Sequence, residues 1–178
     1  PTPQKRPERS GEIVISSKSI DRKALFMQVP QTSADLLESA GSVFVQRSQM
    51  GGGSPMIRGF AANRVLLVVD GVRMNNAIFR DGNVHNVISI DPQMLEGVEV
   101  YEGPGSVIFG SDALGGVMYF KTKTLTTKED TSKGFVFSGN TSLQLHSANR
   151  GNTWHIDFQA QGRKFSSLTG VTFSNYNS

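Results

Sequence analysis

Short apolar runs alternate with glycine-dense turns through the middle of the chain, from Met56 to Lys123. Of the 19 glycines in the chain, 13 lie between Gly41 and Gly116, and glycine is the residue that permits tight turns and close backbone contacts. This pattern suits neither an amphipathic helix nor an ordinary catalytic loop. It predicts a compact α+β domain, in which a small mixed β-sheet is combined with short helices.

Local signals define several elements of this domain. Residues 32–40 are predicted to form a short helix, because Thr32 and Asp35 have the spacing of a capping box. Residues 65–70 form a nearly continuous apolar run, which predicts a strand buried on both faces. Asp70-Gly71 is typical of a hairpin turn. Further strands are expected at 43–47, 72–74, 98–102 and 117–122, single helical turns at 92–96 and 104–110, and loops at 48–55 and 75–86.

The residues before and after this domain differ in composition. Residues 1–30 are assigned to an N-terminal leader, of which 1–11 is polar, charged and proline-bearing and is expected to be disordered. Within the leader, residues 12–17 form a short β-prone run. This run is either the first strand of the domain or an extended peptide that adds to the edge of a partner's sheet. Residues 124–133 are rich in threonine and lysine and are assigned to a linker.

The last part of the chain, residues 134–178, is patterned with a period of two. The apolar face of its first two strands consists of Phe135, Phe137, Leu143, Leu145, Trp154, Ile156, Phe158 and Ala160. Such alternation over about ten residues is typical of lipid-facing and lumen-facing positions in a transmembrane β-barrel. A register that pairs His146 with His155 keeps the apolar residues on one face. Residues 167–176 are expected to form a third antiparallel strand.

Three strands are too few to close a barrel. Open strands would leave backbone groups unsatisfied in lipid, which costs several kcal/mol for each group. The chain is therefore expected to be a fragment or to be completed by strands from elsewhere. No secretory signal peptide opens it, so Pro1 is expected to be a processed or truncated start. The edge of a soluble sandwich is the alternative for these strands.

Composition excludes several classes of function. The chain has no cysteine, which removes thiol nucleophiles and cysteine-based metal sites. Between residues 31 and 120 there are five arginines, no lysine and nine acidic residues, a net charge of −4. Because no basic cluster is interleaved with aromatic residues, nucleic acid is not expected as a partner. No run reaches the ~18 apolar residues of a transmembrane helix.

The motifs of the central domain occur in a recognisable order. Arg58-Gly59 comes first, Asp70-Gly71 follows, and the glycine-rich run 99–116 comes last. In this order and approximate spacing they resemble the plug domain of TonB-dependent outer-membrane receptors, and the resemblance covers residues 12–123 firmly. It implies that residues 31–123 are a plug lodged inside a barrel of about 22 strands. Residues 134–178 would then be the first antiparallel strands of that barrel.

The resemblance also implies a function and partners. Such a receptor lies in the outer membrane of a Gram-negative bacterium and imports a scarce nutrient with energy that TonB transmits. The implied partners are the periplasmic domain of TonB, outer-membrane lipid, the remainder of the barrel and an iron chelate or haem as transported ligand, with a surface lipoprotein left open. No cofactor is expected. The segment that resembles a TonB box is Glu12, Ile13, Val14, Ile15, Ser16 and Ser17.

Three charged residues of the plug motifs are candidates for contact with the barrel. They are Arg58, Glu99 and Glu102, whose side chains can form charge-assisted hydrogen bonds. Internal ion pairing within the plug is an equal alternative, and neither interpretation makes these residues catalytic.

The resemblance places ligand contacts in the loops 46–55 and 75–83. The candidates are Gln49, Met50, Phe79, Arg80 and His85. Residues 79–87 somewhat resemble the haem and haemoglobin branch of the family, in which case His85 would be an iron ligand, since imidazole suits iron. A structural or merely exposed histidine is the alternative. A ferric siderophore or haem is the expected cargo, ahead of cobalamin, carbohydrate or peptide.

Two other classes of function remain as alternatives. For an enzyme, residues 51–55 are rich in glycine, but the Gly-Lys-Ser/Thr of a phosphate-binding loop does not follow. No Gly-x-Ser-x-Gly motif is present either, so no catalytic residue is expected. The other alternative is a surface binding module of the same fold that does not transport.

Overall fold

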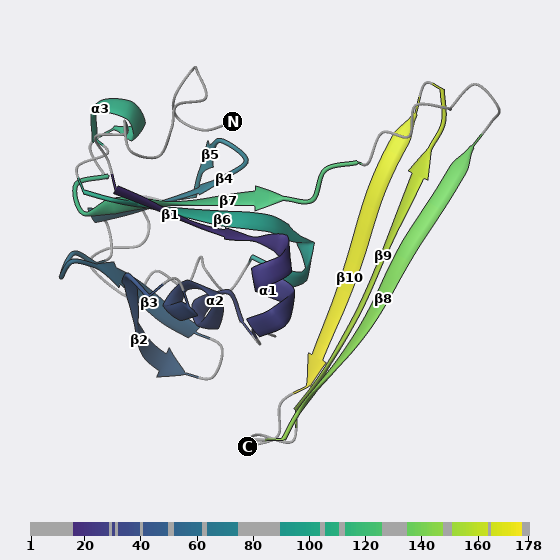
Figure 1. Ribbon diagram of the computed structural model, residues 1–178, viewed down its shortest axis with the longest axis horizontal. Helices are drawn as coiled ribbons and strands as arrows, with labels where there is room; N and C mark the ends of the chain where they lie inside the picture. The colour runs from purple at the N-terminus through teal and green to yellow at the C-terminus, as the bar shows by residue number, and fades with distance from the viewer. Residues whose placement is uncertain are drawn as a thin grey trace. The chain divides into compact units, whose positions relative to one another are not determined.

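The computed structural model divides the chain into two compact units, Pro1–Thr122 and Lys123–Ser178. The described residues are 16–28, 30, 32–39, 41–49, 52–61, 64–74, 90–103, 106–110, 113–125, 135–147, 151–163 and 165–175. Figure 1 shows their helices and strands along the chain. Within this part of the chain, no helix has the length and apolar character needed to cross a bilayer.

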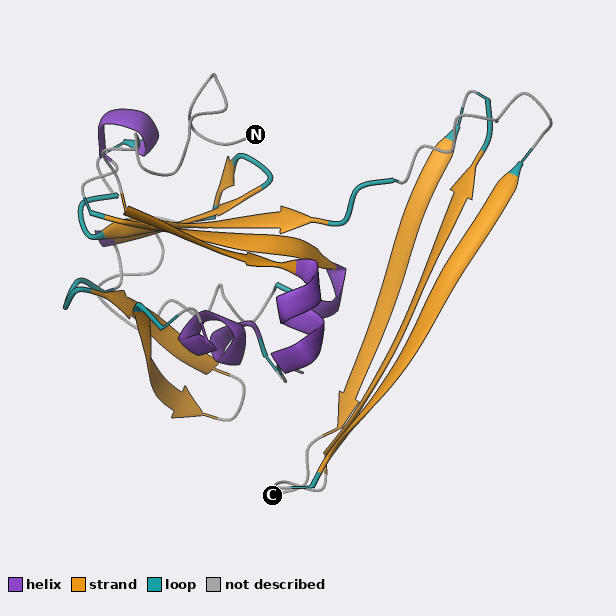
Figure 2. Cartoon of the chain, viewed as in Figure 1, coloured by secondary structure: helices purple, strands orange, loops and turns teal. Residues whose placement is uncertain are grey.

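A five-stranded mixed sheet forms the framework of the first unit. Its strands are β1 (Ser16–Asp21), β4 (Val65–Val69), β5 (Val72–Arg73), β6 (Leu95–Glu102) and β7 (Gly116–Thr122), in the order β1-β6-β7-β4-β5. β4 and β7 are parallel, and the other neighbours are antiparallel. The central strand β7 has a partner on each side, whereas β1 and β5 are edge strands of this sheet (Figure 2). The predicted α+β class is confirmed.

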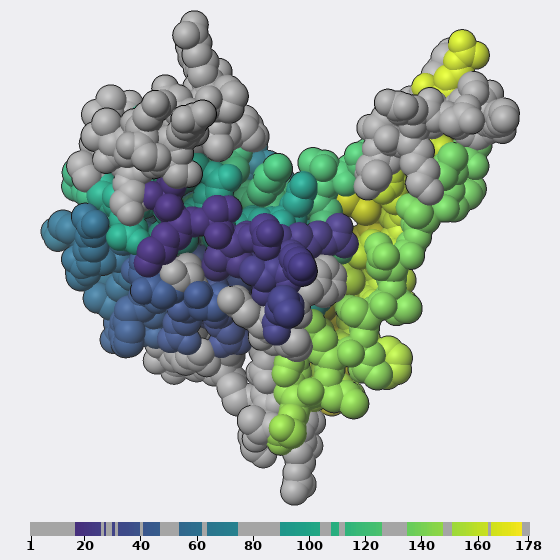
Figure 3. All heavy atoms as spheres, viewed as in Figure 1, coloured from purple at the N-terminus to yellow at the C-terminus, as the bar shows by residue number. Residues whose placement is uncertain are grey.

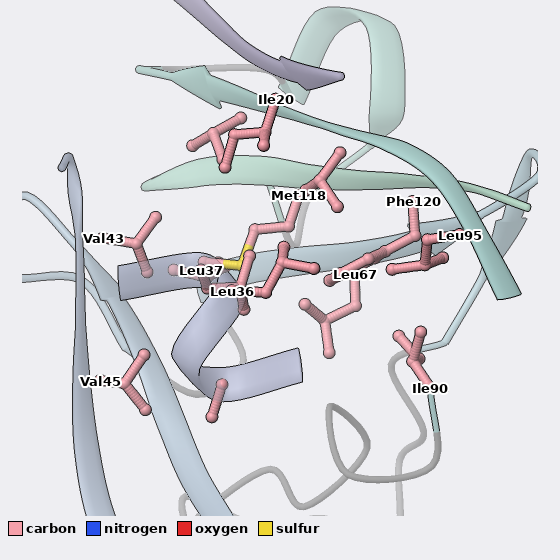
Figure 4. Close-up of a cluster of buried hydrophobic side chains, with 14 of the residues drawn as sticks. Ile20, Leu36, Leu37, Val43, Val45, Leu67, Ile90, Leu95, Met118 and Phe120 are labelled. Atoms are coloured by element: carbon pink, nitrogen blue, oxygen red, sulfur yellow. The ribbon is translucent and has the colours of Figure 1, made fainter. Parts of the chain in front are cut away.

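Two helices and a hairpin cover one face of the sheet (Figure 1). They are α1 (Arg22–Gln28), α2 (Ser33–Ser39) and the antiparallel pair of β2 (Val43–Gln49) and β3 (Gly52–Ile57). Leu36 and Leu37 of α2 are fully buried in one cluster with Met118 of β7, whose side chain extends from the sheet toward them (Figure 4). Because burying one such side chain stabilises a fold by about 1.5–3 kcal/mol, this cluster is the main core of the unit.

The opposite face of the sheet is buried in a second cluster, against which Phe109 of α3 (Ser106–Phe109) packs. The members of this cluster are Leu66, Val68, Tyr101, Ala113, Val117 and Tyr119. β4 contributes to both clusters, since Val65 and Leu67 belong to the first and Leu66 and Val68 to the second. The prediction of a strand buried on both faces is therefore confirmed for β4.

Turn and cap signals in the sequence have the structures that they predict. Asp70 (φ +48°) and Gly71 (φ +88°) adopt left-handed backbone angles and connect β4 to β5. The Asp70 carboxylate also accepts hydrogen bonds from the backbone N–H and the hydroxyl of Thr122, at 3.0 and 2.6 Å. Thr32 and Asp35 form the predicted capping box: the N–H of Thr32 donates to the Asp35 carboxylate at 3.0 Å. The N–H of Asp35 donates to the Thr32 hydroxyl at 3.3 Å.

Four shorter predicted elements can also be compared with the structure. The helical turn expected at 92–96 is the 3-10 helix η3 (Pro92–Met94), and the Asp91 carboxylate accepts a hydrogen bond from the N–H of Gln93. The turn expected at 104–110 is α3, of which Ser106–Phe109 are helical. The strands expected at 98–102 and 117–122 are parts of β6 and β7.

Two predicted boundaries differ from the structure. β1 and α1 lie within residues 1–30, which were expected to be a leader, and their residues Ile20 and Leu25 are buried in the main core. The short polar strand β1 has too few apolar residues to be distinguished by periodicity. The loop expected at 48–55 is largely strand, because β2 continues to Gln49 and β3 begins at Gly52. β3 is rich in glycine and lacks an apolar pattern, so its pairing with β2 rather than its side chains defines it.

The second unit contains an antiparallel sheet of three long strands, in the order β10-β9-β8. They are β8 (Val136–His146), β9 (Gly151–Gln161) and β10 (Ser166–Asn175). Along β9 the burial of side chains alternates. The buried side chains are those of Thr153, His155 and Asp157. The exposed ones between them are Trp154, Ile156 and Phe158. The alternation predicted for this part of the chain is therefore present.

The predicted register of β8 and β9 is wrong. His146 lies opposite Gly151 and not opposite His155, whose partner is Ser142. The two registers differ by an even number of residues, so each side chain stays on the predicted face. The connection between the strands is shorter than expected, which lets β8 and β9 pair along their full lengths. The two histidines are consequently not cross-strand neighbours.

We expect Gly116→Ala to destabilise the first unit by about 1–3 kcal/mol, the usual range for overpacking. A Cβ at this position would lie 2.6 Å from the carbonyl oxygen of Tyr101 and 2.8 Å from Cδ1 of Ile57. The thermal midpoint of the purified protein, measured by calorimetry, should fall. Ser19→Ala on the exposed side of β1 is the control and should change stability by less than about 0.5 kcal/mol. An unchanged midpoint for Gly116→Ala would show that β6 and β7 can separate enough for a methyl group.

Candidate functional site

The edge strand β1 is attached to the sheet by its backbone pairing with β6, by the buried side chain of Ile20 and by one carboxylate. Glu102, the last residue of β6, has one oxygen 3.7 Å from Nζ of Lys18 on β1. Its other oxygen is 3.4 Å from Nη2 of Arg58, in the turn after β3. The carboxylate is 12% exposed, whereas the side chains of Lys18 and Arg58 are 48% and 60% exposed. Ion pairs with exposed cations contribute little, roughly 0–1 kcal/mol each, so the pair with Lys18 adds little to the attachment of β1.

Arg58 is held beside Glu102 by an unusual backbone conformation. Arg58 (φ +51°) and Gly59 (φ +83°) are both left-handed, and Ile57 and Phe60 close the turn with two backbone hydrogen bonds of 2.9 and 2.8 Å. The left-handed region costs an ordinary residue about 1–2 kcal/mol, which these hydrogen bonds help to offset. The internal ion pair between Arg58 and Glu102 is therefore present. Contact of either charge with a barrel side chain stays a prediction.

Glu99 is engaged by a tyrosine. The hydroxyl of Tyr101 donates a hydrogen bond to the Glu99 carboxylate, and Tyr119 of β7 lies directly opposite Glu99. Burial, followed by the hydrogen bond to Glu99, raises the pKa of Tyr101 far above its ordinary value, and burial also raises the pKa of Tyr119. Both phenols consequently keep their protons at physiological pH, and Tyr101 remains a donor to the carboxylate. A barrel partner for Glu99 stays a prediction.

The segment that resembles a TonB box lies only partly within the described residues. Ser16 and Ser17 open β1, opposite Glu102 and Tyr101 of β6, while Glu12, Ile13, Val14 and Ile15 lie outside the described residues. β1 is at the surface of the first unit (purple in Figure 3), and Ser17 is exposed. Of the two alternatives for this segment, Ser16 and Ser17 therefore follow the first: they belong to the first strand of the sheet. Docking of a partner on this segment stays a prediction.

The predicted ligand contacts are mostly outside the described residues. This applies to Met50, Phe79, Arg80 and His85. Gln49 is the last residue of β2 and lies opposite Gly52 of β3. Gln49 is thus at the tip of a hairpin and not in the open loop expected at 46–55. Ligand contact by these residues stays a prediction.

A polar cluster in the second unit, with His155 and Asp157 buried and Asn140 exposed, was not predicted. It is centred on Asp157 of β9 and also contains Lys123, Asn140, His155 and Thr172. The alternation of β9 placed Asp157 on the polar face, but nothing in the sequence indicated its partners. The available signal was a carboxylate on that face and a lysine directly after a buried strand. No group of three or more His, Cys, Asp or Glu side chains among the described residues could hold a metal ion.

Known proteins that match this chain define its family. Residues 10–117 match the family model of the TonB-dependent Receptor Plug Domain. The vitamin B12 transporter BtuB of Vibrio vulnificus (strain CMCP6) is 36% identical over 131 residues, which are 71% of this chain and 20% of that protein. The hemin receptor of Yersinia pestis is 33% identical over 104 residues, which are 58% of this chain and 15% of that protein. The chain spans about a fifth or less of the length of these relatives.

Solved structures share the fold over nearly the whole chain. The copper transporter OprC covers 90% of this chain with a TM-score of 0.73 and 20% identity, using 24% of its own length. The ferripyoverdine receptor of the outer membrane of Pseudomonas aeruginosa covers 94% with a TM-score of 0.72 and 18% identity, using 21% of its own length. The shared fold agrees with a plug domain followed by the first strands of the barrel. The family model shows that this chain belongs to the TonB-dependent receptors.

Proposed function

We propose that this chain is the plug and the first barrel strands of an outer-membrane receptor that imports a scarce nutrient. The match of residues 10–117 to the receptor plug domain carries the proposal. In the proposed mechanism the receptor lies in the outer membrane of a Gram-negative bacterium and acts by binding and gating rather than by catalysis. TonB transmits the energy that displaces part of the plug and opens a path through the barrel.

The apolar face of β8–β10 supports a position against lipid. Leu143, Trp154 and Phe173 form a cross-strand row over the three strands and are 50%, 52% and 67% exposed. Other exposed apolar side chains of these strands are Phe137, Leu145, Ile156, Phe158 and Val171. Soluble monomers rarely expose a continuous apolar face of this size. In a barrel this face lies against lipid, and the alternate polar residues face the lumen.

An arginine on the apolar face of β9 should therefore be far more harmful than one on the polar face. We expect Phe158→Arg to destabilise the full-length receptor in lipid by up to about 2–4 kcal/mol, depending on its depth in the bilayer. Gln159→Arg, one residue away on the opposite face, is the matched control and should have a much smaller effect. The measurement is urea-dependent folding into lipid vesicles. Equal losses for the two variants would contradict the lipid-facing assignment.

For TonB, we propose docking at the segment Glu12–Ser17. β1 is an edge strand of the five-stranded sheet, and a peptide that precedes an edge strand can present its backbone to the strand of a partner. The backbone groups of Ser16 and Ser17 already take part in the pairing with β6. Docking would consequently use residues 12–15, or else require β1 to leave β6.

Val14→Pro tests this docking, because proline removes a backbone donor that strand addition needs. In the full-length receptor, energised uptake should be lost while binding of the nutrient and the thermal midpoint are retained. Thr2→Pro is the control for an added proline in the N-terminal region and should leave uptake unchanged. Unchanged uptake for Val14→Pro would contradict docking at this segment. A lowered thermal midpoint, with binding lost as well, would instead assign the segment to the first strand of the plug.

For the transported nutrient, we propose a ferric siderophore or haem. Haem is favoured by relatives such as the hemin receptor of Yersinia pestis and the heme/hemopexin utilization protein C of Haemophilus influenzae, 36% identical over 107 residues. Cobalamin is the second candidate, because a vitamin B12 transporter matches 71% of this chain at 36% identity.

Binding assays with the full-length receptor separate these ligands. We expect saturable binding of haem or of a ferric siderophore, and no more than weak binding of cyanocobalamin. If haem binds, His85→Ala should weaken its affinity several-fold through loss of an imidazole ligand, whereas the control His146→Ala on β8 should not. If only cyanocobalamin binds saturably, the transported ligand is cobalamin and not an iron compound. Unchanged haem affinity in His85→Ala would remove His85 from the ligand site.

A further inference from the structure

The polar cluster around Asp157 ties the first residue of the second unit to the polar face of β9. Nζ of Lys123 is 2.6 Å from Oδ2 of Asp157, and the two side chains are 6% and 5% exposed. Nε2 of His155 is 3.1 Å from the same oxygen, and Nδ2 of Asn140 donates to Oδ1 at 3.0 Å. Nδ1 of His155 is 2.6 Å from the hydroxyl of Thr172. Since a carboxylate only accepts hydrogen bonds, a neutral His155 carries its proton on Nε2 and accepts from Thr172.

We infer that Lys123 is a positioning residue: through Asp157 it fixes the end of β7 to the barrel, so that the plug opens from its N-terminal side. The inference rests on the proposed function, in which TonB pulls on the segment before β1. Lys123 directly follows Thr122, the last residue of β7. Its ion pair with Asp157 joins residues 34 positions apart. The chain is therefore held at Lys123 itself and not only through the residues that lead on to β8.

The surroundings of the ion pair make it difficult to break. An exposed ion pair contributes little, because water solvates the separated charges. Removing one partner of a buried pair leaves an uncompensated charge out of water, which is strongly destabilising. Both side chains of this pair are more than nine-tenths buried, and Asn140 and His155 bind the same carboxylate. A displacement of Lys123 would separate the pair and leave the Asp157 carboxylate without its ammonium partner.

Lys121, two residues earlier on β7, shows the contrast. It is 44% exposed and its Nζ is 4.0 Å from Glu96, which is itself 39% exposed. Loss of the Lys121 ammonium removes a weak surface pair and leaves the Lys123–Asp157 pair in place. Lys121→Met is consequently the matched control for Lys123→Met, since both substitutions remove one ammonium near the end of β7 and keep an unbranched stem of four heavy atoms.

The test uses cells that carry the full-length receptor, with and without functional TonB, and supplies haem, a ferric siderophore and cyanocobalamin together. The measured quantity is the entry of vancomycin, which is too large to cross the intact outer membrane readily. Lys123→Met should increase vancomycin sensitivity several-fold only when TonB functions, because a plug that is not fixed at β7 leaves the barrel as a whole. Asp157→Asn should have the same effect, while Lys121→Met and Lys123→Arg should not.

Three negative results can be told apart. If the unaltered receptor imports no supplied nutrient in a TonB-dependent way, the proposed function fails. If import depends on TonB but Lys123→Met cells resist vancomycin as well as Lys121→Met cells do, the inference about Lys123 is overturned. A general structural defect would raise sensitivity equally with and without TonB, and this result would also overturn it.

A covalent link keeps the inference testable if Lys123→Met does not fold. The chain contains no cysteine, so Lys123→Cys and Asp157→Cys can be joined by a short bismaleimide in the full-length receptor. The linked receptor should import normally and exclude vancomycin, because this junction does not have to open. Arrest of import by the link, with import retained in the unlinked double variant, would overturn the inference.

Discussion

The plug depends on one strand that is enclosed on all sides. β7 pairs with β6 on one edge and with β4 on the other, and both of its faces are buried. Met118 and Phe120 belong to the main core, and Val117 and Tyr119 to the second cluster. At its start, Gly116 lies so close to the carbonyl oxygen of Tyr101 that no Cβ fits. Local opening is easiest where buried contacts are few, so the sheet is most stable at β7 and least stable at its edge strands.

Sequence reasoning succeeded where the signal is local. The capping box of Thr32 and Asp35 and the turn Asp70-Gly71 depend on residues a few positions apart, and both have the expected geometry. It offered a first strand only at residues 12–17 and missed the rest of β1, which is mostly polar and is a strand because β6 lies beside it. It also failed for the register of β8 and β9. Registers that differ by an even number of residues place the same side chains on the same face, so alternation alone does not select among them.

For the charged residues too, the sequence indicated local features but not contacts between distant residues. The motif order drew attention to Arg58 and Glu102, but a sequence does not show that the left-handed turn at Arg58 brings the two together. Asp157 was placed on the correct face of β9 by alternation. Its partner Lys123 was not identified, since it precedes a threonine- and lysine-rich segment in which one lysine resembles the next. A buried carboxylate needs a partner, and that requirement is the one hint that the sequence contained.

The two ends of the plug are attached in physically different ways, and the difference suits the proposed opening by a pull on the N-terminal segment. At the N-terminal end, β1 pairs with β6 alone, and Ile20 is its buried apolar side chain. Separation of β1 therefore exposes little apolar surface and breaks one ion pair, whose cation Lys18 is already half exposed. At the other end, displacement of β7 would open both core clusters and separate the charged side chains of Lys123 and Asp157. In the proposed mechanism, a pull on the N-terminal segment removes the edge strand first and leaves β6, β7 and β4 intact as a template. Because that template presents the free edge of β6 in its original register, β1 can pair again as soon as the pull ends.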